Sequence, residues 1–163
     1  MHGFEAVTVA QIAGGSGVSE MTFFRHFATK HGVLFDDPYD EVIAAAVGQQ
    51  TQGVAPLGRA VAGFRHAWRM VPEPETDLVR RRVRVIATTP TLRGEMSQNN
   101  AVTEVLVAEQ LARDGTDPLS SKIAAAAVLA AITAALFEWS LHEGTPLGEF
   151  IEVALDVVEG RDG

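Results

Sequence analysis

The chain of 163 residues is 47% hydrophobic and 21% charged, which suits one cored domain with or without a small additional module. It has no cysteine, so disulfides, thiolate zinc sites and cysteine nucleophiles are excluded. No basic segment followed by an apolar one begins the chain, and we therefore expect a cytoplasmic protein without a signal peptide.

The formal net charge of −8 is distributed unevenly. Up to Phe35 two acidic residues, Glu5 and Glu20, balance two basic ones, Arg25 and Lys30, so the negative charge lies entirely downstream. This asymmetry predicts a small binding module attached to an acidic body.

Two short helices are expected near the N-terminus, each with its own capping residue. Thr8 and Gln11 have the spacing of a capping box, which predicts a helix that ends near Gly14 to Gly17. Ser19 can cap a second helix, with Glu20 in its first turn near the positive end of the helix dipole. Two capped helices joined by a glycine-containing turn form a helix-turn-helix pattern.

Further helix starts follow along the chain. Thr29 can cap a short segment, and Asp37-Pro38 can open the next helix because proline is preset for the first helical turn. The stretch with glycine and proline after that helix predicts a domain boundary. We expect one domain over residues 1–52 and the other over residues 53–163.

The second domain is predicted to be helical as well. Leu57, Val61, Phe64, Trp68 and Val71 recur at spacings of four and three residues, which is the pattern of one helix face. The further helices expected from caps, prolines and glycines cover Thr76 to Ala87, Thr91 to Arg113, Asp117 to His142 and Pro146 to Glu159, and Gly94 can interrupt the second of these. The predicted fold class is therefore all-α.

The N-terminal pattern resembles a known family. Gly-Phe is followed by Thr8-x-x-x-Ile-Ala, Gly17-Val-Ser and Phe23-Phe-x-His-Phe-x-x-Lys, in the order seen in the DNA-binding domain of TetR family transcriptional regulators. The matching stretch is GFEAVTVAQIAGGSGVSEMTFFRHFATKHGVL, which ends at Leu34. The resemblance implies that the second helix of the motif enters the major groove of DNA. It also implies that a helical ligand-binding and dimerisation domain follows.

By their position in the family motif, nine residues are expected to contact double-stranded operator DNA. An arginine can bind guanine through two hydrogen bonds and a glutamate can accept one from cytosine, whereas phosphate contacts fix the register. The family usually has tyrosine where this chain has Phe24, so one hydroxyl that could bind phosphate is absent. The residues expected near phosphates are Thr8, Thr22, Phe24, His26 and Lys30, and those expected near base edges are Ser19, Glu20, Met21 and Arg25.

The family also has a further helix before Gly3, whereas only Met1 and His2 precede the match here. We therefore expect the first helix of the DNA-binding domain to be missing, through truncation or a late start codon, and a longer parent to be the DNA-binding form. The alternative function is a dimeric interaction protein, derived from such a regulator, that does not bind DNA.

One predicted helix is apolar on all sides. The run from Ile123 to Phe137 is interrupted only by Thr133 and is shorter than the roughly 18–20 residues of a membrane span, so no membrane partner is expected. A domain of this size can hardly enclose such a helix alone, whereas a second chain can cover it. The resemblance implies a homodimer formed by the last two helices. The alternative is a central helix in a monomer.

The family commonly has a small-molecule cavity in its helical domain, and an unidentified effector is therefore an expected partner. Aromatic residues at helical spacing are also the usual content of a core, so both interpretations stay open. The basic run from Arg80 to Arg84 is expected to be solvated and paired with acids, with a bound ligand anion as the alternative. The candidate cavity residues are Phe64, Trp68, Met96, Phe137 and Trp139.

Enzyme chemistry finds no support in the sequence. His26 and His31 do not share a helix face across the Thr29 cap, so no metal pair is expected, and the serines near His142 lack the strand-turn-helix setting of a hydrolase nucleophile. We expect no cofactor and no catalysis. The function we predict is a dimeric repressor that a small molecule releases from a palindromic operator by shifting the helix that Pro38 opens.

Overall fold

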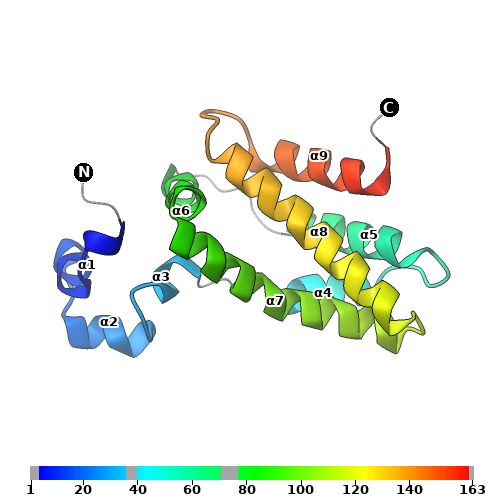
Figure 1. Cartoon of the computed structure of the whole chain (residues 1–163), viewed down its shortest axis with the longest axis horizontal. Helices are drawn as coiled ribbons and strands as arrows, with labels where there is room; N and C mark the ends of the chain where they lie inside the picture. Colours follow the sequence, from blue (N-terminus) through cyan, green and yellow to red (C-terminus); the bar gives the residue numbers. More distant parts are fainter. Residues whose placement is uncertain (1–3, 36–39, 71–76, 162–163) are drawn as a thin grey trace.

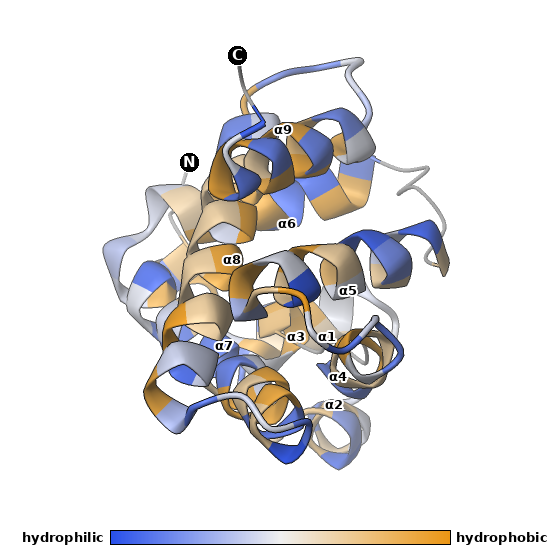
Figure 2. Ribbon diagram, turned by 90° about the vertical axis from the view of Figure 1, so that its right-hand side faces the viewer, coloured by the Kyte–Doolittle hydropathy of each residue, from blue (hydrophilic) through white to orange (hydrophobic). Residues whose placement is uncertain are grey.

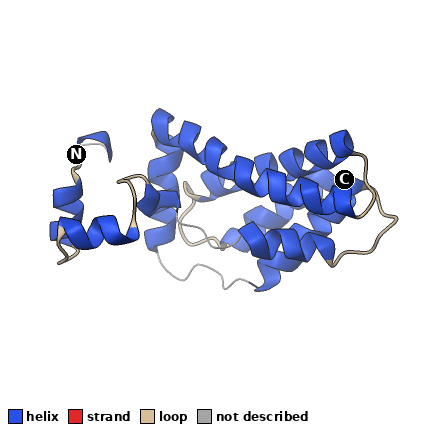
Figure 3. Ribbon diagram, turned by 90° about the horizontal axis from the view of Figure 1, so that it is seen from below, coloured by secondary structure: helices blue, strands red, loops and turns tan. Residues whose placement is uncertain are grey.

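The computed structural model describes residues 4–35, 40–70 and 77–161, and every regular element within these ranges is a helix. The predicted all-α fold class is confirmed. Figures 1 and 3 show an elongated molecule in which η1, α1 and α2 lie at one end and the longer helices form a bundle at the other. We call η1 to α3 the N-terminal module and α4 to α9 the helical body. The elements are η1 (Phe4–Ala6), α1 (Val9–Gly15), α2 (Glu20–His26), α3 (Gly32–Phe35), α4 (Asp40–Gly48), α5 (Pro56–Met70), α6 (Asp77–Thr88), α7 (Pro90–Arg113), α8 (Pro118–Trp139) and α9 (Leu147–Glu159).

Side chains hold the ends of the short helices in the N-terminal module. The amide of Thr8 donates to Gln11 Oε1 at 2.8 Å and the amide of Gln11 donates to Thr8 Oγ1 at 3.2 Å, which confirms the capping box. At the start of α2 the amide of Thr22 donates to Ser19 Oγ at 3.1 Å. Interactions within three residues therefore fix where α1 and α2 begin.

The helical body encloses the main hydrophobic core. α5 and α8 pack against each other, with α4, α7 and α9 packed around them. In Figure 2 hydrophobic residues gather along α8 and on the inner sides of its neighbours. Burying one aliphatic side chain contributes about 1.5–3 kcal/mol, so this core is the main source of stability. Its fully buried aliphatic side chains include Val47, Val61, Val107, Leu111, Val128 and Leu155.

Two helices differ from their predicted extents. α7 continues without interruption through Gly94, because a single glycine costs a helix only about 1 kcal/mol and the packing of α7 on its neighbours offsets this. α8 ends at Trp139, earlier than the predicted His142, and Gly144 with φ of +77° lies in the turn that leads to α9.

α4 connects the N-terminal module to the rest of the body and packs against α5 and α7. It ends at Gly48, whereas the sequence predicts a helix to about Gln52, and residues 49–55 lead to α5. Its predicted start at Asp37-Pro38, the cap at Thr76 and the stripe residue Val71 lie outside the described residues. The domain boundary after residue 52 falls in the loop that follows α4 and stays a prediction.

α4 and α5 cross at very short distance at Gly63. A Cβ atom at this position would lie 2.6 Å from the Cα atom of Val47 and 2.9 Å from its backbone nitrogen. Val47 itself has no exposed surface. Glycine is the residue that permits this approach, because any side chain would overlap the backbone of α4. The crossing holds α4 against α5 within the body.

Two arginines of α5 form ion pairs, one with the end of α7 and the other with α9. Arg59 is almost fully buried and donates to the carboxylate of Asp114, at the end of α7, and this hydrogen bond lowers the pKa of Asp114 below its ordinary value. Removing one partner of a buried pair is costly, because the other charge is then left uncompensated. Arg65 holds α9 against α5 through three acids, which are Glu152 at 2.6 Å, Glu159 at 2.8 Å and Asp156.

α8 is long and apolar enough, by length and composition, to cross a membrane. It has 22 residues, and its most apolar window has a mean hydropathy of 1.8, although the uninterrupted apolar run within it is shorter. The core helix of a soluble protein passes the same test. Ala125, Val128 and Trp139 lie buried on its inner side, against the neighbouring helices. This inner side makes α8 a core helix of the body.

We predict that Gly63→Ala lowers the free energy of unfolding by about 1–2 kcal/mol, because overlap with Val47 outweighs the higher helix propensity of alanine. The matched control is Gly94→Ala in α7, where nothing lies within 4 Å of the new methyl group. That variant is expected to be neutral or more stable by up to about 1 kcal/mol. Urea unfolding at one protein concentration measures both. Equal stabilities would contradict the close crossing.

Candidate nucleic-acid interface

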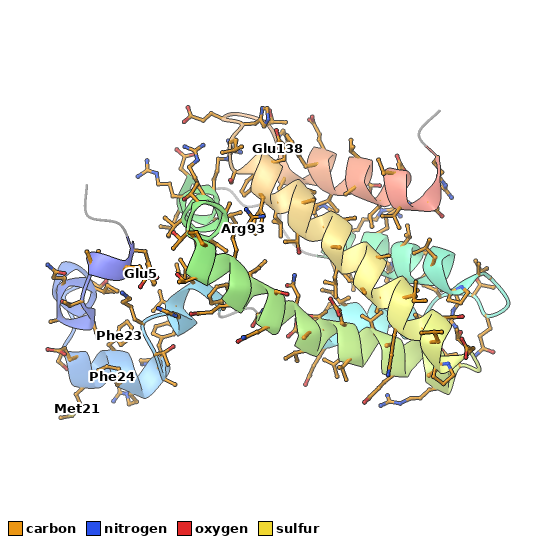
Figure 4. The ribbon with its side chains drawn as sticks, viewed as in Figure 1. Glu5, Met21, Phe23, Phe24, Arg93 and Glu138 are labelled. Carbon is orange, nitrogen blue, oxygen red and sulfur yellow. The ribbon has the colours of Figure 1, made fainter. Side chains whose placement is uncertain are left out.

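α2 presents one face to solvent at the end of the molecule far from the body (Figure 1). Met21 is 84% exposed and Phe24 is 51% exposed, so two large apolar side chains of one short helix contact water. Figure 4 shows Met21 at the outer edge of the protein. Glu20, Arg25 and His26 are exposed on the same helix. The face therefore combines a carboxylate, a guanidinium and apolar surface, and the imidazole of His26 is exposed at the end of the same helix.

The inner side of α2 is packed on the rest of the module. Phe23 is buried, and its ring centroid lies 5.5 Å from those of both Phe24 and Phe27. Ala13 of α1 is also buried, where α1 and α2 make contact. Edge-to-face and tilted aromatic pairs of this kind add stability beyond the area that they bury. Phe23 therefore fixes which face of α2 points outward.

Two of the predicted contact residues, Thr8 and Ser19, cap helices with their hydroxyl groups, and the hydroxyl group of a third, Thr22, pairs with that of Ser19. Thr8 Oγ1 accepts the amide hydrogen of Gln11 and also donates to Gln11 Oε1 at 3.3 Å. Ser19 Oγ lies 3.0 Å from Thr22 Oγ1, and either oxygen can be the donor. Because the Ser19–Thr22 pair needs one hydroxyl hydrogen for its own bond, one remains for an external acceptor such as a phosphate oxygen.

The sequence predicts that Lys30 contacts a phosphate, whereas in the structure its ammonium group binds acceptors within the protein. Its ammonium group donates to the carbonyl oxygens of Phe4 and Val7, both at 2.9 Å, and to that of Glu5 at 3.4 Å. The nitrogen also lies 4.4 Å from the centroid of the Phe4 ring. An ammonium group has three hydrogens to donate, and all three have acceptors within the protein. The structure therefore gives Lys30 a role in holding η1.

The module exposes little formal charge on its described surface. Within residues 4–35 Arg25 is the one arginine or lysine that is exposed, and the acid Glu20 lies on the same helix. The affinity that a protein gains from DNA phosphates rises with the number of cations that it brings to them. A DNA interface on α2 would thus depend on hydrogen bonds and apolar contacts more than on charge.

Four of the candidate cavity residues divide between two separate cavities. Phe64 and Trp68 line an apolar cavity of about 140 Å³ between α4, α5 and α8. Met96 and Phe137 line a more open cavity of about 360 Å³ between α7 and α8, where the guanidinium of Arg93 lies 5.4 Å from the centroid of the Phe137 ring. The two pairs therefore cannot contact one small ligand together.

Trp139, the fifth candidate, is a core residue that lines neither cavity. It is buried, and its Nε1 donates to the carbonyl oxygen of Thr145 at 2.9 Å. Arg80 donates to the same carbonyl oxygen at 2.8 Å and lies 4.6 Å from the Trp139 ring, while Arg84 donates to the carbonyl oxygen of Ser140 at 2.7 Å. Arg80 and Arg84 thus bind backbone carbonyls after α8, where the basic run was expected to pair with acids, whereas Arg81 is exposed to solvent as expected. Cations are favourable at a helix C-terminus, and this is the signal that could have indicated the contact.

Comparison with known proteins identifies the family. The profile of bacterial regulatory proteins of the tetR family matches residues 1–36, and the profile of the MftR C-terminal domain matches residues 54–162, which is more than half of the chain. The chain belongs to the TetR family.

Two relatives support this assignment to the TetR family. One, from Mycobacterium tuberculosis (strain ATCC 25618 / H37Rv), is described as the mycofactocin biosynthesis transcriptional regulator MftR. It is 28% identical over 162 residues, which cover 96% of this chain and 81% of the relative. The other is the HTH-type transcriptional regulator TcmR of Streptomyces glaucescens, 32% identical over 124 residues, which cover 71% of this chain and 55% of TcmR.

Membership in the TetR family confirms the predicted helix-turn-helix domain followed by a helical C-terminal domain with MftR-type sequence. It identifies the protein as a DNA-binding transcriptional regulator of a non-enzymatic family. Sequence reasoning missed the internal contacts of Lys30, because its acceptors are backbone carbonyls that no residue pattern marks.

We predict that Lys30→Met lowers the hydrogen-exchange protection of the η1 to α2 amides by about tenfold, because it removes hydrogen bonds and keeps the length of the side chain. Lys122→Met, at an exposed lysine of α8, is the matched control and should leave these amides unchanged. The salt dependence of DNA binding should also stay unchanged in Lys30→Met. Normal exchange together with a shallower salt dependence would place Lys30 at a phosphate instead.

Proposed function

We propose that this TetR family regulator is a cytoplasmic, dimeric repressor that leaves a palindromic operator when a small molecule binds to its helical body. The observation that carries the proposal is the exposed outer face of α2, with its mixture of Glu20, Met21 and Arg25 at the end of the molecule. The major groove is about 12 Å wide and admits one α-helix, and these residue types match the groups that base pairs present there.

Each exposed residue of α2 is assigned a role by its chemistry. Arg25 can donate two hydrogen bonds to guanine, Glu20 can accept one from cytosine N4, and Met21 can contact a thymine methyl group. Ser19, at the start of the helix, lies nearest the same base edges. The contacts assigned to phosphate and sugar are made by Thr8, Thr22 and His26 through polar groups and by Phe24 through van der Waals contact, and Lys30 is no longer among them.

The uncovered outer side of α8 and α9 supports a dimer. Leu119 and Ile123 of α8 and Val153 and Val157 of α9 are each more than half exposed, although all four are large and apolar. Exposed alanines of α8 lie on the same side and would allow a close approach. A second copy of the chain would cover this surface. Two-fold symmetry would then set two α2 helices about 34 Å apart, the distance between successive major grooves on one face of DNA.

The apolar cavity beside α4 supports an effector that acts on this helix. Val42 and Ile43 of α4 line it together with Phe64 and Trp68 of α5. Its volume of about 140 Å³ is near that of an engineered cavity that binds benzene, so the ligand we propose has a small apolar group that enters here. At the edge of the cavity Thr103 Oγ1 donates to Asp40 Oδ1 at 2.5 Å, at the start of α4. A ligand that expands the cavity would therefore move α4 and, with it, the N-terminal module.

We predict that Ile123→Glu weakens the dimer at least tenfold, because it places a charge within an apolar interface, and that the folded subunit remains intact because the side chain is 60% exposed in it. Sedimentation velocity over a range of protein concentrations measures the dissociation constant. Leu78→Glu is the matched control, at a leucine on α6 that is 73% exposed. A dimer that tolerates Ile123→Glu as well as it tolerates Leu78→Glu would contradict the proposed interface.

The DNA-binding role is tested by selecting duplexes from a random-sequence library with the protein and then measuring affinities by fluorescence anisotropy. We expect the selected sites to be palindromic and bound specifically. Arg25→Gln should weaken binding by about tenfold or more per half-site and relax the preference at one base pair, as loss of a bidentate arginine–guanine contact does. His66→Gln in α5, outside the α2 face, should bind as the unmodified protein does.

Failure of the library to yield any enriched site would favour the alternative, in which the protein dimerises with partners and does not bind DNA. An effect of Arg25→Gln that is equal at every sequence, with a reduced salt dependence, would move Arg25 from a base contact to a phosphate contact.

A further inference from the structure

Two side-chain contacts join the N-terminal module to the start of α7. His31 Nδ1 contacts Glu95 Oε1, and Thr91 Oγ1 donates to Glu5 Oε1 at 2.5 Å. The partners are 64 and 86 residues apart in the sequence, so they are tertiary contacts between the module and the body. In Figure 4 Glu5 lies on the side of the module that faces α7.

On the module side, both contacts lead to one cluster. The ring of Phe4 lies between the Lys30 ammonium group, 4.4 Å from its centroid, and the His31 ring, whose centroid is 5.2 Å away. Lys30 also binds the carbonyl oxygens of Phe4, Glu5 and Val7. These contacts hold the segment after α2 and the η1 turn together. A displacement of His31 or Glu5 would therefore also displace the end of α2.

On the body side, the contacts come from the first two turns of α7, which pack against the core. Thr91 and Glu95 are four residues apart and share one face of α7. Leu92, between them, has no exposed surface and fixes these turns to the core. Arg93, on the other side of the helix, lies over the Phe137 ring of α8. α7 thus offers the module two polar groups at fixed positions.

We infer that Thr91 and Glu95 are positioning residues for DNA binding, which act by holding the N-terminal module, and so α2, in one orientation relative to the dimer axis. They touch no DNA themselves. The inference rests on the proposed dimeric operator binding and adds the residues that set the geometry of the two half-sites. When the contacts are lost, the body holds the orientation of each module less tightly, and the cost of ordering two modules on one operator opposes binding.

Loss of these positioning contacts should affect the affinity for a half-site and the affinity for the whole operator differently. A duplex with one half-site is bound by one module, whose contact face is unchanged in Glu95→Ala or Thr91→Val. A duplex with two half-sites requires both modules at a set separation. We expect the variants to bind the half-site as the unmodified protein does and to bind the full operator about tenfold more weakly. They should also discriminate less against operators whose spacer is one base pair longer or shorter.

The experiment measures the full-length protein and its variants by anisotropy on three duplexes: the half-site, the selected operator, and operators with altered spacers. Glu109→Ala is the matched control, because Glu109 is an exposed acid of α7 that pairs only within its own helix, with Arg113. A double-mutant cycle of His31→Ala and Glu95→Ala should give non-additive losses on the full operator, since both remove the same contact.

The possible outcomes distinguish failure of the proposed function from failure of the positioning role alone. If the unmodified protein binds no selected duplex, the proposed function fails and the positioning role with it. If it binds normally and Glu95→Ala matches Glu109→Ala on every duplex, the positioning role alone is wrong. A Glu95→Ala variant that binds both the half-site and the full operator more weakly, with a lower Tm, would show that Glu95 only supports the folding of the module and would also overturn the inference.

Discussion

The close crossing of α4 and α5 at Gly63 is the constraint on which the other features depend. The backbone of α4 at Val47 lies where a side chain on α5 would have to be, so the two helices meet there in direct backbone contact. α4 also lines the apolar cavity and leads to the N-terminal module. One helix therefore packs in the core, lines the cavity proposed for the ligand and follows the N-terminal module along the chain.

The N-terminal module is too small to fix its own orientation. In its described residues only Ala13 and Phe23 are buried, so little apolar surface stabilises it by itself. Lys30 compensates within the module by binding the carbonyl oxygens of η1, and the start of α7 holds the module from outside. The placement of α2 is thus set by the body as much as by the helix-turn-helix motif. A regulator gains from this arrangement, because changes in the body can then alter DNA binding.

Sequence analysis predicted the features that depend on neighbouring residues. The Thr8 and Ser19 caps involve partners three residues away, and the structure has both of them. Sequence analysis did not predict the contacts between residues that are far apart in the sequence. The acceptors of Lys30 lie 23 to 26 residues away and are backbone atoms, and nothing in the chain marks Glu95 as the partner of His31. Cavity residues and core residues share apolar and aromatic character, so this property does not distinguish Trp139, which is buried against Arg80, from a residue that lines a cavity.

The central claim is that this TetR family protein contacts DNA through the exposed face of α2, with the body as the support that orients it. Hydrogen exchange with and without a saturating amount of selected operator duplex tests it directly, because it locates the contact along the chain. The account predicts increased protection over α2 and the cap that precedes it, a smaller increase at the start of α7, and little change on the outer face of α8 and α9. Protection confined to α8 and α9, with α2 unchanged, would contradict it.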